Sequence, residues 1–95
     1  MVNIASWNVR GLNRPKKQED VKAFLQKYQI SLIGLLETKV KEEKVRAVAA
    51  RLFQGWEWHH NFNQTAKGRI WVVWKRQVYR IQILKVTDQL IHCAA

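Results

Sequence analysis

Two polar side chains, Asn8 and Glu37, each stand at the end of an apolar stretch of this 95-residue sequence. The Asn8 amide has an acceptor and two donors, so it can orient a carboxylate, a water or a phosphate. The Glu37 carboxylate is a hard oxygen ligand suited to Mg²⁺, which binds one or two carboxylates together with water and substrate phosphate. If the two stretches are neighbouring strands, both groups lie past the strands' carboxyl ends, where open α/β sheets bind ligands. Each residue alone also has an ordinary interpretation, Asn8 as a turn residue and Glu37 as a surface glutamate before a helix.

The elements that would position these groups are indicated by hydrophobic spacing. Residues 2–7 predict a short strand, and residues 30–36 form a near-continuous apolar run, as expected of a strand buried on both faces. Between them, after Pro15, apolar residues recur at i, i+3, i+4 and i+7, which predicts an amphipathic helix. A second amphipathic helix is predicted from about Glu42 to Gly55. Crossovers of this kind imply that the first two strands pair in parallel.

Beyond the second helix the pattern changes to consecutive strands separated by short polar or glycine-containing turns. The predicted fold class is therefore α/β, a mixed sheet with two helices on one face, in the order β-α-β-α-β-β-β-β. The last predicted strand reaches the end of the sequence without a turn or a polar tail, and five tryptophans are many for so small a core. We therefore expect residues 1–95 to be part of a larger domain. The four later strands are predicted over residues 55–62, 69–75, 77–86 and 89–95.

The charge balance favours a polyanionic partner. Lysines and arginines number 17 against 7 acidic residues, a net charge of +10, so DNA or another nucleic acid is the favoured partner over a merely soluble basic surface. Six basic residues follow the first two strands and would lie on the same rim as Asn8 and Glu37, where they could hold backbone phosphates. They are Arg10, Arg14, Lys16, Lys17, Lys39 and Lys41.

Several protein classes are disfavoured. The single cysteine, Cys93, excludes an intramolecular disulfide. The first residues lack the features of a signal peptide, and no apolar stretch is long enough to cross a bilayer. We therefore expect an intracellular protein, nuclear or cytoplasmic, that is neither secreted nor bound to a membrane. His59 and His60, within an aromatic strand, are expected to be structural.

Three segments resemble a known family. Residues 6–13 (SWNVRGLN) and 36–39 (LETK) resemble the first two motifs of the endonuclease/exonuclease/phosphatase superfamily, which has the DNase I-like fold, and residues 68–74 (GRIWVVW) resemble the strand that follows. The sequences of these motifs are most similar to those of the endonuclease domains of plant LINE-type retrotransposons. The resemblance runs through essentially all 95 residues but covers less than half of the family's complete domain. It implies that the chain is the N-terminal part of a four-layer α/β sandwich.

The resemblance also implies roles for individual residues. Glu37 would ligate a catalytic Mg²⁺, for which Mn²⁺ can substitute, and Asn8 would support the metal and the scissile phosphate, so both would be catalytic and metal-site residues. The activity implied is that of a phosphodiesterase whose metal polarises the phosphate. Related apurinic endonucleases carry an acidic residue at the position of Arg10. Because this chain has an arginine there instead, a phosphate contact or a structural role is favoured for Arg10. The family's later motifs, an Asp and an Asn on a strand end and a terminal Asp-His pair, are not among these residues.

Three functions remain open from the sequence. The first is a fragment of a Mg²⁺-dependent, retrotransposon-type endonuclease acting on DNA, which we expect to be inactive alone. The second is a non-enzymatic, basic nucleic-acid-binding remnant, and the third is a fragment of a superfamily phosphatase. In each case the inner face of the sheet would expose apolar side chains, so we also expect self-association through that face or marginal stability.

Overall fold

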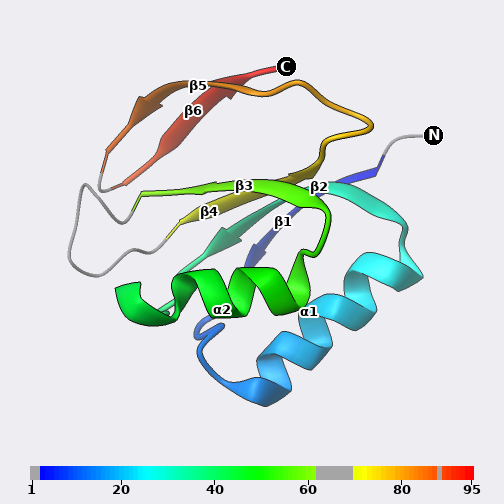
Figure 1. The fold of residues 1–95 in the computed structure, drawn as a ribbon, viewed down its shortest axis with the longest axis vertical. Helices are drawn as coiled ribbons and strands as arrows, with labels where there is room; N and C mark the ends of the chain where they lie inside the picture. Colours follow the sequence, from blue (N-terminus) through cyan, green and yellow to red (C-terminus); the bar gives the residue numbers. More distant parts are fainter. Residues whose placement is uncertain (1–2, 62–69, 88) are drawn as a thin grey trace.

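The chain alternates strands and helices in its first half and has strands alone in its second half, which is the predicted order. The computed structural model describes residues 3–61, 70–87 and 89–95, drawn in colour in Figure 1. The elements are β1 (Asn3–Asn8), α1 (Pro15–Lys27), β2 (Ile30–Leu36), α2 (Glu42–Leu52), β3 (Trp56–His60), β4 (Trp71–Lys75), β5 (Gln82–Val86) and β6 (Ile91–Ala94).

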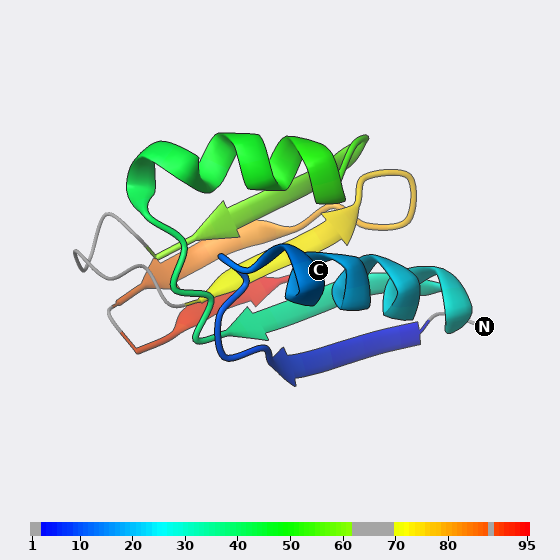
Figure 2. The same ribbon diagram turned by 90° about the horizontal axis from the view of Figure 1, so that it is seen from below.

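A four-stranded mixed sheet carries the candidate site. Its strand order is β1-β2-β4-β3. β1 and β2 pair in parallel, as predicted, while β4 pairs antiparallel with both β2 and β3. Both helices cover the same face of this sheet, which Figures 1 and 2 show from two directions. The predicted fold class, a mixed sheet with two helices on one face, is confirmed.

The main core lies between the helices and this sheet. Ile33 and Leu35 of β2 and Trp71 and Val73 of β4 are fully buried there. The Trp71 indole is therefore part of the core and is not accessible for stacking on a base. Burying each large aliphatic side chain stabilises the fold by about 1.5–3 kcal/mol. The helices contribute buried residues at helical spacing, namely Val21 and Leu25 from α1 and Val45, Val48, Ala49 and Leu52 from α2.

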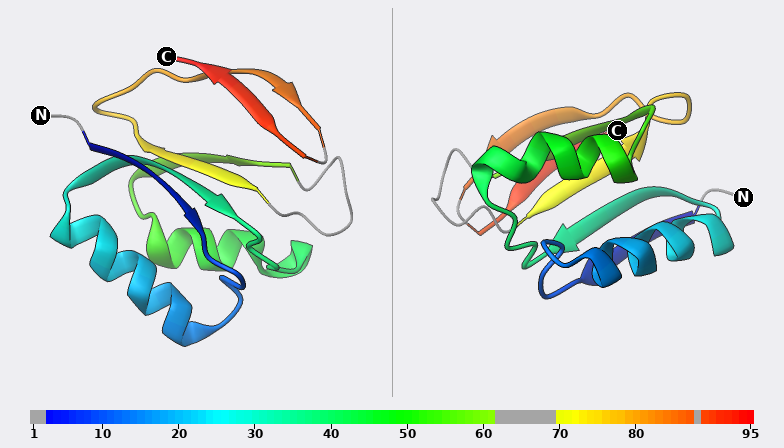
Figure 3. Two further views of the ribbon diagram at one scale, coloured as in Figure 1. Left: turned by 180° about the vertical axis from the view of Figure 1, so that it is seen from behind. Right: turned by 60° about the horizontal axis from the view of Figure 1, so that its bottom comes forward.

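The last two strands form a separate sheet, which differs from the prediction of one sheet. β5 and β6 pair antiparallel only with each other and lie on the opposite side of the large sheet from the helices (Figures 1 and 3). The chain leaves the large sheet because a turn closes after β4, where the amides of Val78 and Tyr79 donate to the Lys75 carbonyl at 3.0 and 3.1 Å. The Tyr79 hydroxyl then lies 3.4 Å from the Ser31 hydroxyl. For this reason β5 begins at Gln82 and not at residue 77.

The second sheet covers part of the face that the sequence predicts to be apolar and open. Val72 and Trp74 of β4, which point away from the helices, are only 9% and 7% exposed. At the outer strand β1, Ile4 stays 63% exposed. Leu36, at the end of β2, is 36% exposed. On this face, the exposed large apolar side chains among the described residues of the large sheet are therefore those of Ile4 on β1 and Leu36 on β2.

The remaining predicted bounds are close to the observed ones. The predicted strand 55–62 is β3, although residue 62 lies outside the described residues, and the predicted strand 69–75 is β4, whose residue 69 also lies outside them. The last strand is shorter than predicted at both ends. Within the part of the chain that the structure describes, no helix is long and apolar enough to cross a membrane.

Candidate functional site

Asn8 and Glu37 lie at the same edge of the large sheet, as predicted. Asn8 is the last residue of β1 and pairs in register with Leu36, the last residue of β2. Glu37 follows directly. Because the two strands are parallel neighbours, the amide and the carboxylate start from adjacent strand ends. This arrangement brings two oxygen-bearing side chains to the edge where α/β sheets bind ligands.

Backbone hydrogen bonds continue beyond the strands and tie the two following loops together. Amides of the β1–α1 loop donate to successive carbonyls of the β2–α2 loop, so the parallel ladder extends past the strand ends. Two members of these loops, Leu12 and Thr38, are fully buried. The loops therefore form one packed unit that fixes the backbone at the candidate site. The bonds run from Val9 to Leu36 (3.0 Å), from Gly11 to Glu37 (2.9 Å) and from Leu12 to Thr38 (2.7 Å).

The backbone of this unit is strained at several positions. Arg10, Glu37 and Lys39 have φ of 50°, 52° and 57°, and they are three of the four non-glycine residues with positive φ in the described chain. The left-handed conformation costs such residues about 1–2 kcal/mol each. Gly11 has φ of 112°, and a Cβ there would lie 2.9 Å from the Asn13 Oδ1 atom. Strain of this kind persists only where the surroundings impose it, and it gathers at functional sites.

The side chains of Asn8 and Glu37 are available to a ligand. Asn8 is exposed and Glu37 is partly buried, and within the described residues neither side chain has a hydrogen bond or ion pair. Their amide and carboxylate oxygens are the hard donors that Mg²⁺ prefers. No group of three or more His, Cys, Asp or Glu residues that could hold a metal is found in the described ranges.

Three of the six predicted basic residues are exposed and unpaired at this edge. Within residues 3–61, 70–87 and 89–95, the side chains of Arg10, Lys39 and Lys41 have no hydrogen bond, ion pair or ring contact. They are free to contact a phosphate. Arg10 and Lys39 also have the left-handed backbone noted above, which directs their side chains differently from those of a regular strand.

The other three basic residues have partners inside the protein. The Arg14 guanidinium donates to the Arg10 carbonyl at 3.1 Å and so braces the β1–α1 loop. Lys16 forms an ion pair with Asp20 at 3.2 Å. The Lys17 ammonium lies 5.7 Å from the ring centre of Trp7. These exposed contacts are weak, so a phosphate can compete for the two lysines.

A buried glutamine supports the site and was not predicted from the sequence. Gln18 is 6% exposed, and its amide donates to the Leu12 carbonyl at 2.9 Å. Its oxygen accepts a hydrogen bond from Arg51 of α2 at 3.1 Å. Gln18 thus links both helices to the β1–α1 loop. The signal was present, because Gln18 lies three and seven residues before Val21 and Leu25 on the apolar stripe of α1.

His60 lies at the same edge but on β3, with β4 between it and β2. It is partly buried, and its ring stacks on Trp58 at 5.4 Å. Burial and the neighbouring His59 lower the pKa of His60 below its ordinary value. The next residue, Asn61, is buried, and its side chain joins the two sheets through a 3.1 Å hydrogen bond to the Thr87 carbonyl.

Comparison with known families agrees with this architecture. A sequence model described as the endonuclease/exonuclease/phosphatase family matches residues 5–94. The chain therefore belongs to the endonuclease/exonuclease/phosphatase family, which is one of nuclease- and phosphatase-type hydrolases. No curated protein matches the chain closely enough to count as a relative.

Proposed function

We propose that Asn8 and Glu37 belong to the catalytic site of a Mg²⁺-dependent phosphodiesterase that acts on DNA. The observation that carries the proposal is the pairing of the two strand ends, with the loops behind them joined by consecutive backbone hydrogen bonds. Through this pairing the backbones of Asn8 and Glu37 come from adjacent strand ends, and neither side chain has a hydrogen bond or ion pair within the described residues. Membership in a family of nucleases and phosphatases supports phosphate ester chemistry at that place.

The donors at this edge suit Mg²⁺ or Mn²⁺. The Glu37 carboxylate would hold the ion, and the Asn8 amide would orient a water or phosphate oxygen next to it. When bound, the metal supplies polarisation of the phosphoryl oxygen and stabilises charge that develops during cleavage. Arg10, Lys39 and Lys41 would neutralise the flanking phosphates, because all three are exposed and unpaired within the described residues.

The choice of DNA as substrate rests on the net charge of the chain and on the sequences of the motifs. A net charge of +10 favours a polymer of phosphates over a single small phosphate ester. The similarity of residues 6–13 to plant LINE-type endonucleases supports a retrotransposon-type enzyme. A phosphatase of the same family would instead prefer a small phosphorylated substrate to a plasmid in a direct comparison.

We further propose that residues 1–95 alone do not cleave DNA appreciably. The candidate site has one carboxylate, and the Asp-Asn and Asp-His motifs that the resemblance implies are not among these residues. A plasmid-nicking assay with Mg²⁺ tests this statement. Robust nicking that disappears in Glu37→Ala would contradict inactivity while it supports the assignment of the site.

A binding experiment tests the metal site without requiring activity. Mn²⁺ should broaden the NMR signals of the Gly11, Glu37 and Thr38 amides in the 95-residue chain, because paramagnetic relaxation is limited to nearby nuclei. Glu37→Gln should abolish the effect. Glu43→Gln is the matched control, since Glu43 is an exposed carboxylate in the first turn of α2. Equal broadening in the wild-type chain and in Glu37→Gln would refute the metal site.

The free basic side chains favour a second candidate function, nucleic-acid binding without cleavage. If Arg10, Lys39 and Lys41 each contact one phosphate of duplex DNA, log K should fall against log salt with a slope of about −3. Replacing Lys39 by Gln should reduce the slope by about one. This function predicts binding that does not depend on Mg²⁺ and survives Glu37→Gln, whereas the phosphodiesterase predicts tighter binding with the metal.

A further inference from the structure

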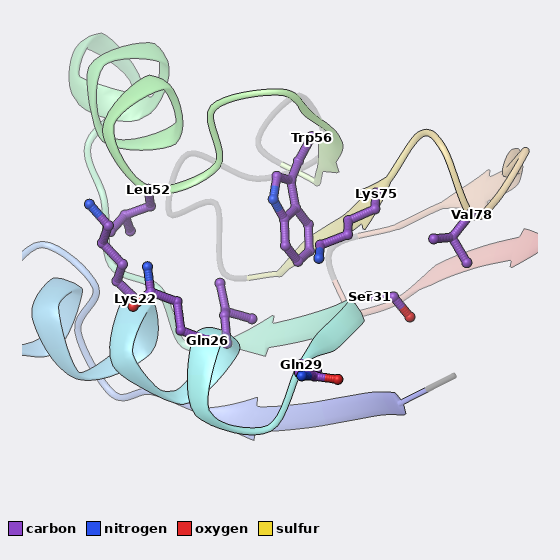
Figure 4. Close-up of a pocket in the computed structure, with 9 residues that line it drawn as sticks. Lys22, Gln26, Gln29, Ser31, Leu52, Trp56, Lys75 and Val78 are labelled. Atoms are coloured by element: carbon purple, nitrogen blue, oxygen red, sulfur yellow. The ribbon is translucent and has the colours of Figure 1, made fainter. Parts of the chain in front are cut away.

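A cavity of about 550 Å³ opens at the edge of the large sheet opposite Asn8 and Glu37 (Figure 4). It lies where β2 and β3 begin and β4 ends, beside the C-terminal half of α1. A nucleotide-sized ligand fits this volume, since ligand pockets in proteins measure about 300–1,000 Å³. The polar and aromatic groups that matter for its chemistry are Lys22, Gln26, Gln29, Ser31, Trp56 and Lys75.

The lining is positively charged. Lys22 and Lys75 approach the cavity from α1 and from β4, and no aspartate or glutamate is among the described residues that line it. A carboxylate in the adjacent strand, Glu57, is held 3.3 Å from Arg76 by an ion pair. The described residues therefore provide no negative charge inside the cavity. Two lysines without an acidic neighbour favour an anion as the ligand.

Uncharged amides add hydrogen-bonding capacity. The side chains of Gln26 and Gln29 make no hydrogen bond within the described residues, and each presents one acceptor and two donors. Ser31 has a different role, because its hydroxyl donates to the Asn3 carbonyl at 3.2 Å and forms part of the wall. Two amides without a hydrogen bond among the described residues suit a ligand whose polar edge carries both donors and acceptors, such as a nucleobase.

A tryptophan supplies a flat wall. Trp56 is partly buried, packs against Phe53 at 5.9 Å between ring centres, and has the Lys75 ammonium 5.5 Å from its ring centre. Trp56 and Lys75 also line a second hollow of about 400 Å³, so the depression continues past them. Cation–π contacts at exposed sites are weak, so an anion can draw Lys75 away and uncover the ring. The uncovered indole face can then stack on a base.

We propose that this cavity binds a nucleoside phosphate, either a free nucleotide or the phosphorylated end of a nucleic-acid strand. The phosphate pairs with Lys75, and Lys22 adds a second positive charge at the other wall. The base stacks against Trp56, and the amides of Gln26 and Gln29 contact its polar edge. The site lies at the other edge of the sheet from Glu37, and its described lining has no carboxylate, histidine or cysteine, so it does not rest on the phosphodiesterase proposal.

The test is an NMR titration of the ¹⁵N-labelled 95-residue chain without Mg²⁺. The probes are AMP, adenosine, inorganic phosphate and a 5′-phosphorylated oligoadenylate. AMP should shift the Trp56 indole signal and the Gln29 and Ser31 amides, with an affinity at least tenfold above those of adenosine and phosphate. Tighter binding of the oligonucleotide than of AMP identifies a strand end as the ligand, and the reverse order identifies a free nucleotide.

Matched variants locate the site. Lys75→Gln should weaken AMP binding about tenfold, because one charge-assisted contact to phosphate is lost. Lys44→Gln removes the same charge from an exposed position on α2 outside the cavity and should leave the affinity unchanged. Gln26→Ala, at an exposed helix position, should weaken AMP but not phosphate. These variants keep the proposal testable even if replacement of Trp56 unfolds the chain.

Three results would overturn the proposal. They are equal affinities for AMP and inorganic phosphate, an unchanged affinity in Lys75→Gln, and shifts confined to the edge that carries Asn8 and Glu37. Glu37→Gln separates this proposal from the phosphodiesterase. It should leave AMP binding at the cavity intact even though it removes the Mn²⁺ effect at the other edge. Absence of AMP binding at the cavity would therefore contradict this proposal alone, and absence of Mn²⁺ broadening at the other edge would contradict the phosphodiesterase alone.

Discussion

Replacement of Gly11 by alanine should destabilise the protein by about 2–4 kcal/mol. Gly11 has φ of 112°, and a Cβ would lie 2.9 Å from Asn13 Oδ1. A side chain in so rarely populated a backbone region costs about 1–3 kcal/mol. The new Cβ also displaces the loop locally and weakens the 2.9 Å hydrogen bond from Gly11 to the Glu37 carbonyl, which adds about 0.5–1.5 kcal/mol. Asn13 is exposed and can move, so backbone strain is the larger contribution.

Thermal and urea unfolding followed by circular dichroism measure the effect. At about 4–8 °C per kcal/mol for a domain of this size, Tm should fall by roughly 10–30 °C. Gly34→Ala is the control, because Gly34 lies within β2, its φ is not positive, and a Cβ added there would meet nothing within 4 Å. That variant should be neutral or more stable by about 0.5–1 kcal/mol. A Gly11→Ala chain within about 0.5 kcal/mol of wild type, or an equal loss in Gly34→Ala, would refute the reasoning.

The remaining predictions concern three other parts of the molecule. Gln18→Ala should lose about 1–3 kcal/mol in urea unfolding, because the buried Leu12 carbonyl loses its 2.9 Å partner. Burial lowers the pKa of His60 from its ordinary 6.5, so below pH 6.5 the unfolded chain binds more protons than the folded chain. The contribution of His60 to the free energy of unfolding should therefore be complete above pH 6.5 and decrease as the pH falls toward the pKa of the folded state. Urea unfolding at several pH values across this range should show the decrease in unfolding free energy, and the decrease should be smaller in His60→Gln. Ile4→Ser should reduce self-association in sedimentation experiments, because Ile4 is 63% exposed on the open side of the sheet, whereas Leu84→Ser on the second sheet should not.

Much of the fold was predictable because hydrophobic periodicity reports local structure. The long apolar run of β2 indicates a strand covered on both faces. The helices bury Ile33 and Leu35 on one face, whereas on the other face Leu32 and Gly34 are half-buried and Leu36 is exposed. The assignment of β5 to a separate sheet was not predictable. Alternation of apolar and polar residues at 79–83 indicates a half-exposed strand but does not say which sheet it joins. That choice depends on the turn at Lys75 and on the long-range contact between Tyr79 and Ser31.

The candidate site was predictable in position but not in detail. Asn8 and Glu37 could be placed at one edge because the ends of parallel strands meet there. The left-handed conformations of Arg10 and Lys39 have no signal in the sequence, since arginine and lysine rarely adopt them and both depend on the surrounding loops. Gln18 did have a signal, as a polar residue on an apolar helical stripe.

Backbone interactions position this candidate site and leave the side chains of Asn8 and Glu37 without partners among the described residues, which allows a role in binding to be tested separately from stability. The loops are joined through amides and carbonyls, including the Glu37 carbonyl, while the Glu37 carboxylate has no partner within the described residues. Glu37→Gln keeps the backbone hydrogen bond and brings no new strain, because glutamine has the same branching as glutamate. We therefore expect its unfolding free energy to stay within about 0.5 kcal/mol of wild type. A larger loss in urea unfolding would mean that the carboxylate has a structural role, and loss of Mn²⁺ binding in that variant would then no longer identify a metal ligand.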